Sequence, residues 1–237
     1  MMKLPVIFAG HGSPMIALED NELTKEFQKI GERVVSEFEK PKAILSFSAH
    51  WFTRGTYVQS DPEPRQVYDM YGFPKELYEV QYHPKGCQEL TDDILALLPD
   101  ISINDDWGID HGTWTVLVHM FPGAPIPVVQ LSIDGIEGPQ SAYDIGKALA
   151  PLREKGYLLL GSGNIVHNLR RLEWDNPNGS PQADRFDAAY AAPTADHFLP
   201  LLYTLGAAQG EKPEIFNNVR NTGSLSMTGY LFGFGEK

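Results

Sequence analysis

The stretch PVIFAGHGSP, residues 5–14, joins an apolar run to a turn of small residues that contains one histidine. The run Pro5–Ala9 carries no charge and stops at a glycine, which is typical of a strand buried in the sheet of an α/β protein. Three further runs have the same character and are bounded by Gly, Pro or Ser: Ala43–Phe47, Pro127–Ile133 and Tyr157–Leu160. We expect these four runs to be buried strands of one sheet.

Two weaker segments are expected beside these strands. Tyr57–Gln59 could form a hairpin with the preceding strand through Arg54-Gly55, and the aromatic run Leu225–Phe232 is a candidate edge strand.

Helical spacing alternates with the strand runs. In the first predicted helix, Asn21 is placed as the N-cap. The apolar face of this helix is formed by Leu23, Phe27, Ile30, Val34 and Phe38. Further helices are predicted around 90–98, from Asp110 to Phe121, and from about Ser141 to Arg153. The alternation predicts a single α/β domain, residues 1–237, with a central, largely parallel or mixed sheet covered by helices on both faces.

Composition excludes some classes of function. Nineteen basic and 31 acidic residues give a net charge of −12, which argues against nucleic acid because phosphate binding needs a basic surface. Cys87 is the only cysteine, so neither an internal disulfide nor a cysteine-based metal site can form. The N-terminal segment does not resemble a signal peptide, and no apolar run approaches the length of a membrane span. We therefore expect a cytoplasmic protein with no membrane partner.

Three of the seven histidines follow predicted strands. His11 comes after the first strand, His50 lies in SFSAHW after the second, and His167 lies in GSGNIVHNL after the Tyr157–Leu160 run. A single loop histidine is usually exposed or hydrogen-bonded. Open α/β sheets, however, place their sites at strand ends, and imidazole is a common ligand of zinc and iron. Three histidines in equivalent places therefore indicate one divalent metal ion.

Two more histidines have both a structural and a functional interpretation. His197, in PTADHFLP, is either a helix-surface residue beside an acidic neighbour or part of the metal site, where Pro200 would kink the chain. His111, in DHGTW, either follows a capping Asp110 incidentally or acts as an acid, base or hydrogen-bond donor near the metal. His119 is expected to be a structural residue, and His83 is expected to lie in a loop.

The stretch Gly161-Ser162-Gly163 raises two other functions. A glycine-rich turn can hold phosphate, but the full dinucleotide pattern is absent because Val166 occupies its last glycine position. A serine hydrolase is poorly supported because there is no GxSxG motif.

Five ordered motifs carry a family resemblance: GHGSP, SFSAHW, DHGTW, GSGNIVHNL and PTADHFLPLL. Together they resemble the class III extradiol ring-cleavage dioxygenases, and most closely the 4,5-DOPA dioxygenase-like branch. The resemblance covers nearly the whole chain, and it is much more specific for the superfamily than for the substrate.

The resemblance implies a role for each histidine. His11 and His50 match the two strand-end metal ligands, and His167 and His197 match further histidines of the metal site. His111 matches an active-site histidine that contacts substrate or dioxygen, while His167 could instead be the base. The implied substrates are a small aromatic diol (a DOPA-like catechol) and O2. Zinc is the expected metal in the protein as isolated, and Fe(II) is expected for ring cleavage because zinc has no redox chemistry.

Two features of the chain depart from the family pattern. Its expected metal site contains only histidines, whereas distant relatives use two histidines and a glutamate. The branch also has a longer segment between its RFD and PTxDH motifs, but here only Ala188–Ala192 separates the two. Either a lid segment near 187–193 has been lost or the sequence is interrupted there; we favour an interruption. A zinc-dependent hydrolase and a non-enzymatic binding protein on the same scaffold are the alternative functions.

Overall fold

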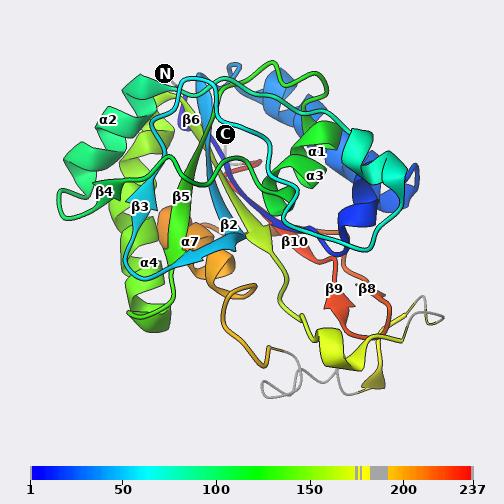
Figure 1. Ribbon diagram of the computed structural model, residues 1–237. Helices are drawn as coiled ribbons and strands as arrows, with labels where there is room; N and C mark the ends of the chain where they lie inside the picture. The colour runs from blue at the N-terminus through cyan, green and yellow to red at the C-terminus, as the bar shows by residue number, and fades with distance from the viewer. Residues whose placement is uncertain (1, 174–175, 177, 182–191, 236–237) are drawn as a thin grey trace.

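A mixed eight-stranded sheet forms the centre of the computed structural model, which describes residues 2–173, 176, 178–181 and 192–235 (Figure 1). The strand order is β4-β3-β5-β2-β6-β1-β10-β7. The strands of this sheet are β1 (Val6–Gly10), β2 (Ala43–Thr53), β3 (Tyr57–Val58), β4 (Ser102–Ile103), β5 (Val128–Asp134), β6 (Tyr157–Gly163), β7 (Glu214–Phe216) and β10 (Gly229–Phe232). A separate pair is formed by β8 (Arg220–Asn221) and β9 (Leu225–Ser226).

The four central strands, β5, β2, β6 and β1, run parallel to one another. Their carboxyl ends therefore meet at one edge, the place where open α/β sheets build their sites. Antiparallel pairing begins outside this centre, at β3 on one side and β10 on the other.

Helices cover both faces of the sheet, as predicted (Figure 1). One face carries α1 (Glu22–Glu37) and α3 (His111–Met120), and the other carries α2 (Gln88–Leu97), α4 (Gly138–Leu149) and α7 (Leu199–Ala208). Short 3-10 helices lie at Pro14–Leu18, Lys75–Glu79, Ala150–Lys155 and Leu169–Arg171.

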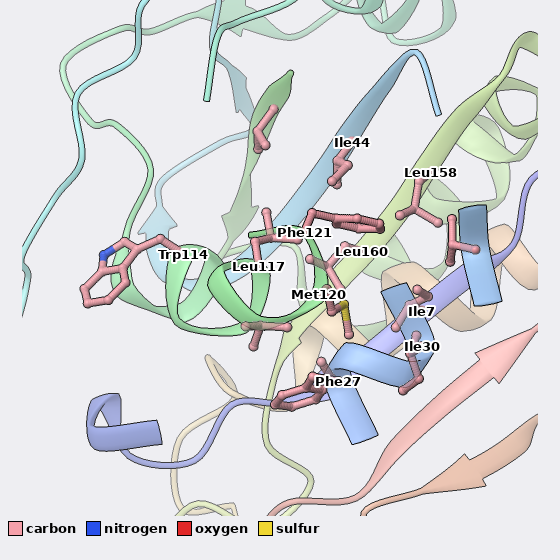
Figure 2. Packing of buried hydrophobic residues seen from close by; sticks show 14 of the residues in the cluster. Ile7, Phe27, Ile30, Ile44, Trp114, Leu117, Met120, Phe121, Leu158 and Leu160 are labelled. Carbon is pink, nitrogen blue, oxygen red and sulfur yellow. The ribbon is translucent and has the colours of Figure 1, made fainter. Parts of the chain in front are cut away.

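The α1/α3 face is packed with large apolar side chains (Figure 2). Phe27 and Ile30 of α1 and Leu117 of α3 meet strand residues such as Ile44 and Leu160, all of them fully buried. Burying one such side chain stabilises the fold by about 1.5–3 kcal/mol. This packing fixes α3, and with it the histidine at its first position, against the sheet.

Both predicted helix caps are present. Asn21 accepts hydrogen bonds from the backbone of Leu23 and Thr24 in a reciprocal capping box, and Asp110 caps α3 through the backbone N–H of Thr113.

Several boundary predictions were wrong. Strand β2 continues through His50 to Thr53, and its register against β5 shifts between Phe47 and Phe52. A β-bulge of this kind interrupts the regular alternation of side chains between the two faces of the sheet but lets the strand continue beyond it. His50 therefore lies within β2 rather than after it. Tyr57 and Val58 do not form a hairpin with β2, because β3 lies between β5 and β4.

The C-terminal and glycine-rich segments also differ from expectation. The run Leu225–Phe232 splits into β9 and β10, and β10 lies inside the sheet while β7 forms the edge. Strand β6 extends through Gly163, so Gly161–Gly163 is strand and not a phosphate-binding turn. Pro200 opens α7 and does not kink it, since proline fits the first turn of a helix.

Across the described part of the chain, we find no helix with the length and apolar character needed to cross a membrane. The position near 187–193 where a lid segment is expected to be missing lies mainly outside the described residues, which resume at residue 192.

Candidate metal centre

A cavity of about 300 Å³ opens at the carboxyl ends of the central strands. Its polar lining consists mainly of imidazoles, contributed by His11, His50, His111, His167 and His197. All five histidines predicted for the site therefore meet in one place, although they are up to 186 positions apart in the sequence. The other two histidines lie elsewhere: His119 contacts the backbone carbonyl of Ile16, and His83 is exposed.

Three of these imidazoles form a compact triangle. One ring nitrogen from each of His11, His50 and His197 lies within 4.8 Å of the other two. The Nε2 atoms of His11 and His50 are 3.3 Å apart. Two nitrogens bound at 2.0–2.1 Å to one tetrahedral metal are separated by about the same 3.3 Å. The spacing therefore suits a shared metal ion.

Ser162 sets the tautomer of His11. Its hydroxyl donates to the carbonyl of Gly112, so its oxygen is left to accept a hydrogen bond. His11 Nδ1 lies 2.9 Å from that oxygen and donates to it. The proton on Nδ1 leaves His11 Nε2 unprotonated, as a metal ligand must be.

His197 is held in the same way by its neighbour in the chain. Its Nδ1 lies 2.7 Å from Asp196 Oδ2. Although burial opposes the shift, the contact with His197 holds the pKa of the Asp196 carboxyl well below its usual range. The Nε2 atom of His197 is buried and has no hydrogen-bond partner among the described residues. A buried polar atom without a partner is costly, and a metal ion between the three histidines would satisfy it. The residues therefore fit a divalent metal.

Asp69 is a part of the site that the sequence reasoning missed. Its Oδ2 lies 3.3 Å from His50 Nδ1 and 2.9 Å from His111 Nδ1. The angle at His111 is not that of a hydrogen bond, so the contact there is one of charge and proximity. Its Oδ1 accepts a hydrogen bond from the backbone N–H of His111 at 3.0 Å. One carboxylate thus reaches two histidines.

His167 lies beside the triangle. Its ring stacks on that of His197 with centroids 3.4 Å apart and planes 4° apart. An imidazole binds a metal through a lone pair in the plane of its ring. Since the two rings are stacked with nearly parallel planes, the ring lone pairs of His197 and His167 do not converge on one point. Within the described chain, His167 belongs to no group of three potential ligand atoms as close as the triangle.

Burial keeps these imidazoles neutral. It is the main cause of a lowered pKa at His11, His50 and His167, with neighbouring histidines adding to the shift, and the pKa of His167 falls to about 3. Neutral imidazoles are the form that binds metals and accepts protons.

The first turn of α3 is held by a buried carboxylate. Asp110 accepts hydrogen bonds from Ser48 at 2.6 Å, from Trp107 at 3.0 Å and from Gln130 at 2.9 Å. Burial, followed by the nearby Asp69, raises the pKa of the Asp110 carboxyl. Because Asp110 also caps the helix, the network fixes the position of His111, the next residue.

Two glycines allow the close approaches that build the site. A Cβ at Gly112 would lie 2.6 Å from Ser48 Oγ and 2.8 Å from the ring of His50. A Cβ at Gly163 would lie 2.3 Å from the carbonyl oxygen of His197. Glycine is needed at both positions for steric reasons.

Comparison with known proteins identifies the family. The family of the catalytic LigB subunit of aromatic ring-opening dioxygenase matches residues 5–190, well over half of the chain.

The chain belongs to the LigB family.

Individual LigB-family relatives match nearly the full length. A protein of Escherichia coli K12 named 4,5-DOPA dioxygenase extradiol is 39% identical, and the match covers 98% of this chain and 95% of that protein. A Beta vulgaris protein of the same name is 34% identical over 95% of each. The crystal structure of an uncharacterized protein from Escherichia coli K12 superposes with a TM-score of 0.83 at 35% identity, over 97% of this chain and 100% of that one.

These matches confirm the resemblance, the fold class and the enzyme class predicted from the motifs. The protein is an aromatic ring-opening dioxygenase of the extradiol family. LigB-family dioxygenases use a divalent metal, and the triangle of His11, His50 and His197 can hold one.

Proposed function

We propose that this enzyme opens the ring of a catechol, with O2, at the bond adjacent to the two hydroxyls. The whole chain, residues 1–237, would act as one catalytic domain. The observation that carries the proposal is the triangle of ring nitrogens from His11, His50 and His197, in which the Nε2 atoms of His11 and His50 are 3.3 Å apart. The Nδ1 atoms of His11 and His197 are hydrogen-bonded to Ser162 and Asp196, and that of His50 lies near Asp69.

The substrate is proposed to be a DOPA-like catechol. The names of the relatives from Escherichia coli and Beta vulgaris support this choice. The cavity suits a small aromatic ring, because Phe73, Leu169, Leu172 and Leu225 give it apolar walls beside the imidazoles.

His11, His50 and His197 are the proposed metal ligands. His167, which matches a fourth ligand of the family branch, stacks on His197 and lies outside the triangle. We therefore place it in the alternative role, as the group that accepts a proton from the catechol, because its ring lines the cavity beside the triangle. His111, which also lines the cavity, is proposed to take up and return a proton at the reacting oxygen atoms.

A bound metal would lower the pKa of the catechol hydroxyls and, as Fe(II), would pass electrons from the catechol to O2. An all-imidazole site has no carboxylate to select hard ions, and zinc binds more tightly than Fe²⁺ in the usual affinity order. Zinc is therefore the metal we expect in protein purified in air. That form is expected to bind catechols without consuming oxygen.

Anaerobic loading with Fe²⁺, followed by an oxygen-electrode assay over a panel of catechols, tests the proposal. We expect oxygen uptake that matches formation of a yellow ring-opened product, and neither signal from the zinc form. Iron-loaded protein that binds catechols but never consumes oxygen would contradict the proposal and favour a binding protein. Ester or amide cleavage by the zinc form, lost in His11→Ala, would instead establish a zinc-dependent hydrolase.

A further inference from the structure

Asp69 occupies a position between two histidines that have different proposed tasks. It lies in the segment between β3 and the 3-10 helix at Lys75–Glu79, and it lines the cavity. Its side chain is only 11% exposed. Its two oxygens face different partners: Oδ1 meets the backbone N–H of His111, and Oδ2 meets the Nδ1 atoms of both His50 and His111.

We propose that Asp69 is a positioning residue that sets the tautomers of His50 and His111 together. Both Nδ1 atoms lie close to the Asp69 carboxylate, at 3.3 Å and 2.9 Å, and its negative charge favours a neutral imidazole with the proton on Nδ1 and an unprotonated Nε2. For His50 this prepares the nitrogen that faces His11. For His111 it leaves Nε2, the nitrogen available to the cavity, unprotonated. The proposal rests on the proposed function, in which His50 is a ligand and His111 a proton-handling group.

No other charged group described around these histidines supplies the same restraint. Asp110, the nearest other carboxylate, is occupied by Ser48, Trp107 and Gln130 and by the cap of α3. Asp196 is engaged with His197 on the far side of the triangle. Only the Asp69 carboxylate lies within 4 Å of Nδ1 of His50 and His111 in the described chain.

The hydrogen bond from the backbone N–H of His111 to Asp69 Oδ1 makes the role testable. It fixes the orientation that a side-chain amide at position 69 would take. In Asp69→Asn the carbonyl oxygen must take the place of Oδ1, since the N–H of His111 needs an acceptor. The amide nitrogen then faces the two imidazoles and donates to their Nδ1 atoms. That donation drives both rings to the Nε2-protonated tautomer. Asp69→Ala removes the restraint without imposing the wrong tautomer.

The proposal therefore predicts that Asp69→Asn binds zinc more weakly than Asp69→Ala. A purely structural role for Asp69 predicts the opposite order. Asparagine has nearly the shape of aspartate, so a residue that only fills space tolerates Asn better than Ala. We expect Asp69→Asn to weaken zinc affinity by roughly 100-fold and Asp69→Ala by roughly 10-fold, within the range typical of groups that orient metal ligands. Asp106→Asn removes a charge at an exposed site outside the cavity and is the matched control; its zinc affinity should equal that of the original protein.

Zinc affinity, measured by competition with a chelator, reports on His50. Nitrogen-15 NMR of labelled histidines in the metal-free protein reports on His111, whose proton we expect on Nδ1 in the original chain and on Nε2 in Asp69→Asn. Tighter zinc binding by Asp69→Asn than by Asp69→Ala would overturn the proposal. So would a proton on Nε2 of His111 in the original chain, a measurement that needs no variant to fold.

Neither measurement uses turnover, so the result stands apart from the proposed reaction. If the iron-loaded protein consumes no oxygen while the expected order and tautomers are found, the reaction fails and the role of Asp69 survives. If oxygen is consumed but the order is reversed, the role of Asp69 fails and the reaction survives.

Discussion

The two ends of the parallel sheet each bury charged or titratable groups, but they treat them differently. At the amino ends of β1 and β6, the fully buried Arg153 donates to the carbonyls of Leu4 and Ala207 and to both oxygens of Glu211. At the carboxyl ends, His197 Nε2 is buried and finds no hydrogen-bond partner in the part of the chain that the structure describes. The comparison separates a structural polar network, complete within the chain, from a site that needs a further molecule to complete it.

The largest effect of a substitution is expected at the carboxyl ends of the strands, as a loss of turnover. His111→Ala should keep its metal and lose turnover by on the order of 10²–10⁴-fold, the usual contribution of an acid or base group. Metal analysis together with oxygen uptake by the iron-loaded variant measures both quantities. If the metal is lost as well, His111 is a ligand, and the division between the triangle and its neighbours is incorrect.

A purely structural effect is expected at the amino end. Arg153→Ala leaves the mostly buried carboxylate of Glu211 without its buried partner and with only Lys3 at the surface, so we expect the free energy of unfolding to fall by about 3–5 kcal/mol. Hydrogen bonds from Arg153 and Lys3 hold the pKa of Glu211 below its ordinary value although burial opposes this. Urea denaturation measures the loss, and zinc affinity of the folded fraction should not change.

Lys3→Ala is the matched control, because Lys3 contacts the same carboxylate from the surface, where it is 39% exposed. Its loss should cost no more than about 1 kcal/mol. Equal costs for the two variants would show that the amino-end network is not the buried restraint described above.

The smallest predicted effect is a dependence of stability on pH in the metal-free protein. An unfolded histidine titrates near pH 6.5, whereas burial lowers the pKa of His167 to about 3. Between these values the unfolded chain binds a proton that the folded protein excludes. Stability should therefore fall as pH drops from about 6.5 toward 3.

Denaturation at pH 7 and at pH 5 measures this loss. It should be smaller in His167→Gln and unchanged in His83→Gln, which alters an exposed histidine. The same pH dependence in all three proteins would rule out His167 as a source.

Local signals explain why much of the fold was predictable. Apolar runs bounded by small residues located the four central strands, and the caps at Asn21 and Asp110 marked two helix starts. The five site histidines could be found because each stands in a short motif near a strand end or a helix start. The predicted metal and catalytic roles stay predictions, as do the cytoplasmic location and the identity of the metal.

What the sequence could not reveal depends on tertiary contacts. Asp69 lies in a segment with no periodic pattern, and its partners are 19 positions before it and 42 after it. Ser162 drew attention only as a nucleophile, whereas its described contacts are to His11 and Gly112. The continuation of β2 through His50 depends on a bulge against β5, which one strand's sequence cannot indicate.

The hydrogen bond from the N–H of Asn164 to the carbonyl of His197 closes a long excursion of the chain at a single point. The entropy of closing a loop grows only with the logarithm of its length, so doubling the loop costs about 0.6 kcal/mol. Residues gained or lost between these two positions therefore have little thermodynamic effect on where His197 sits.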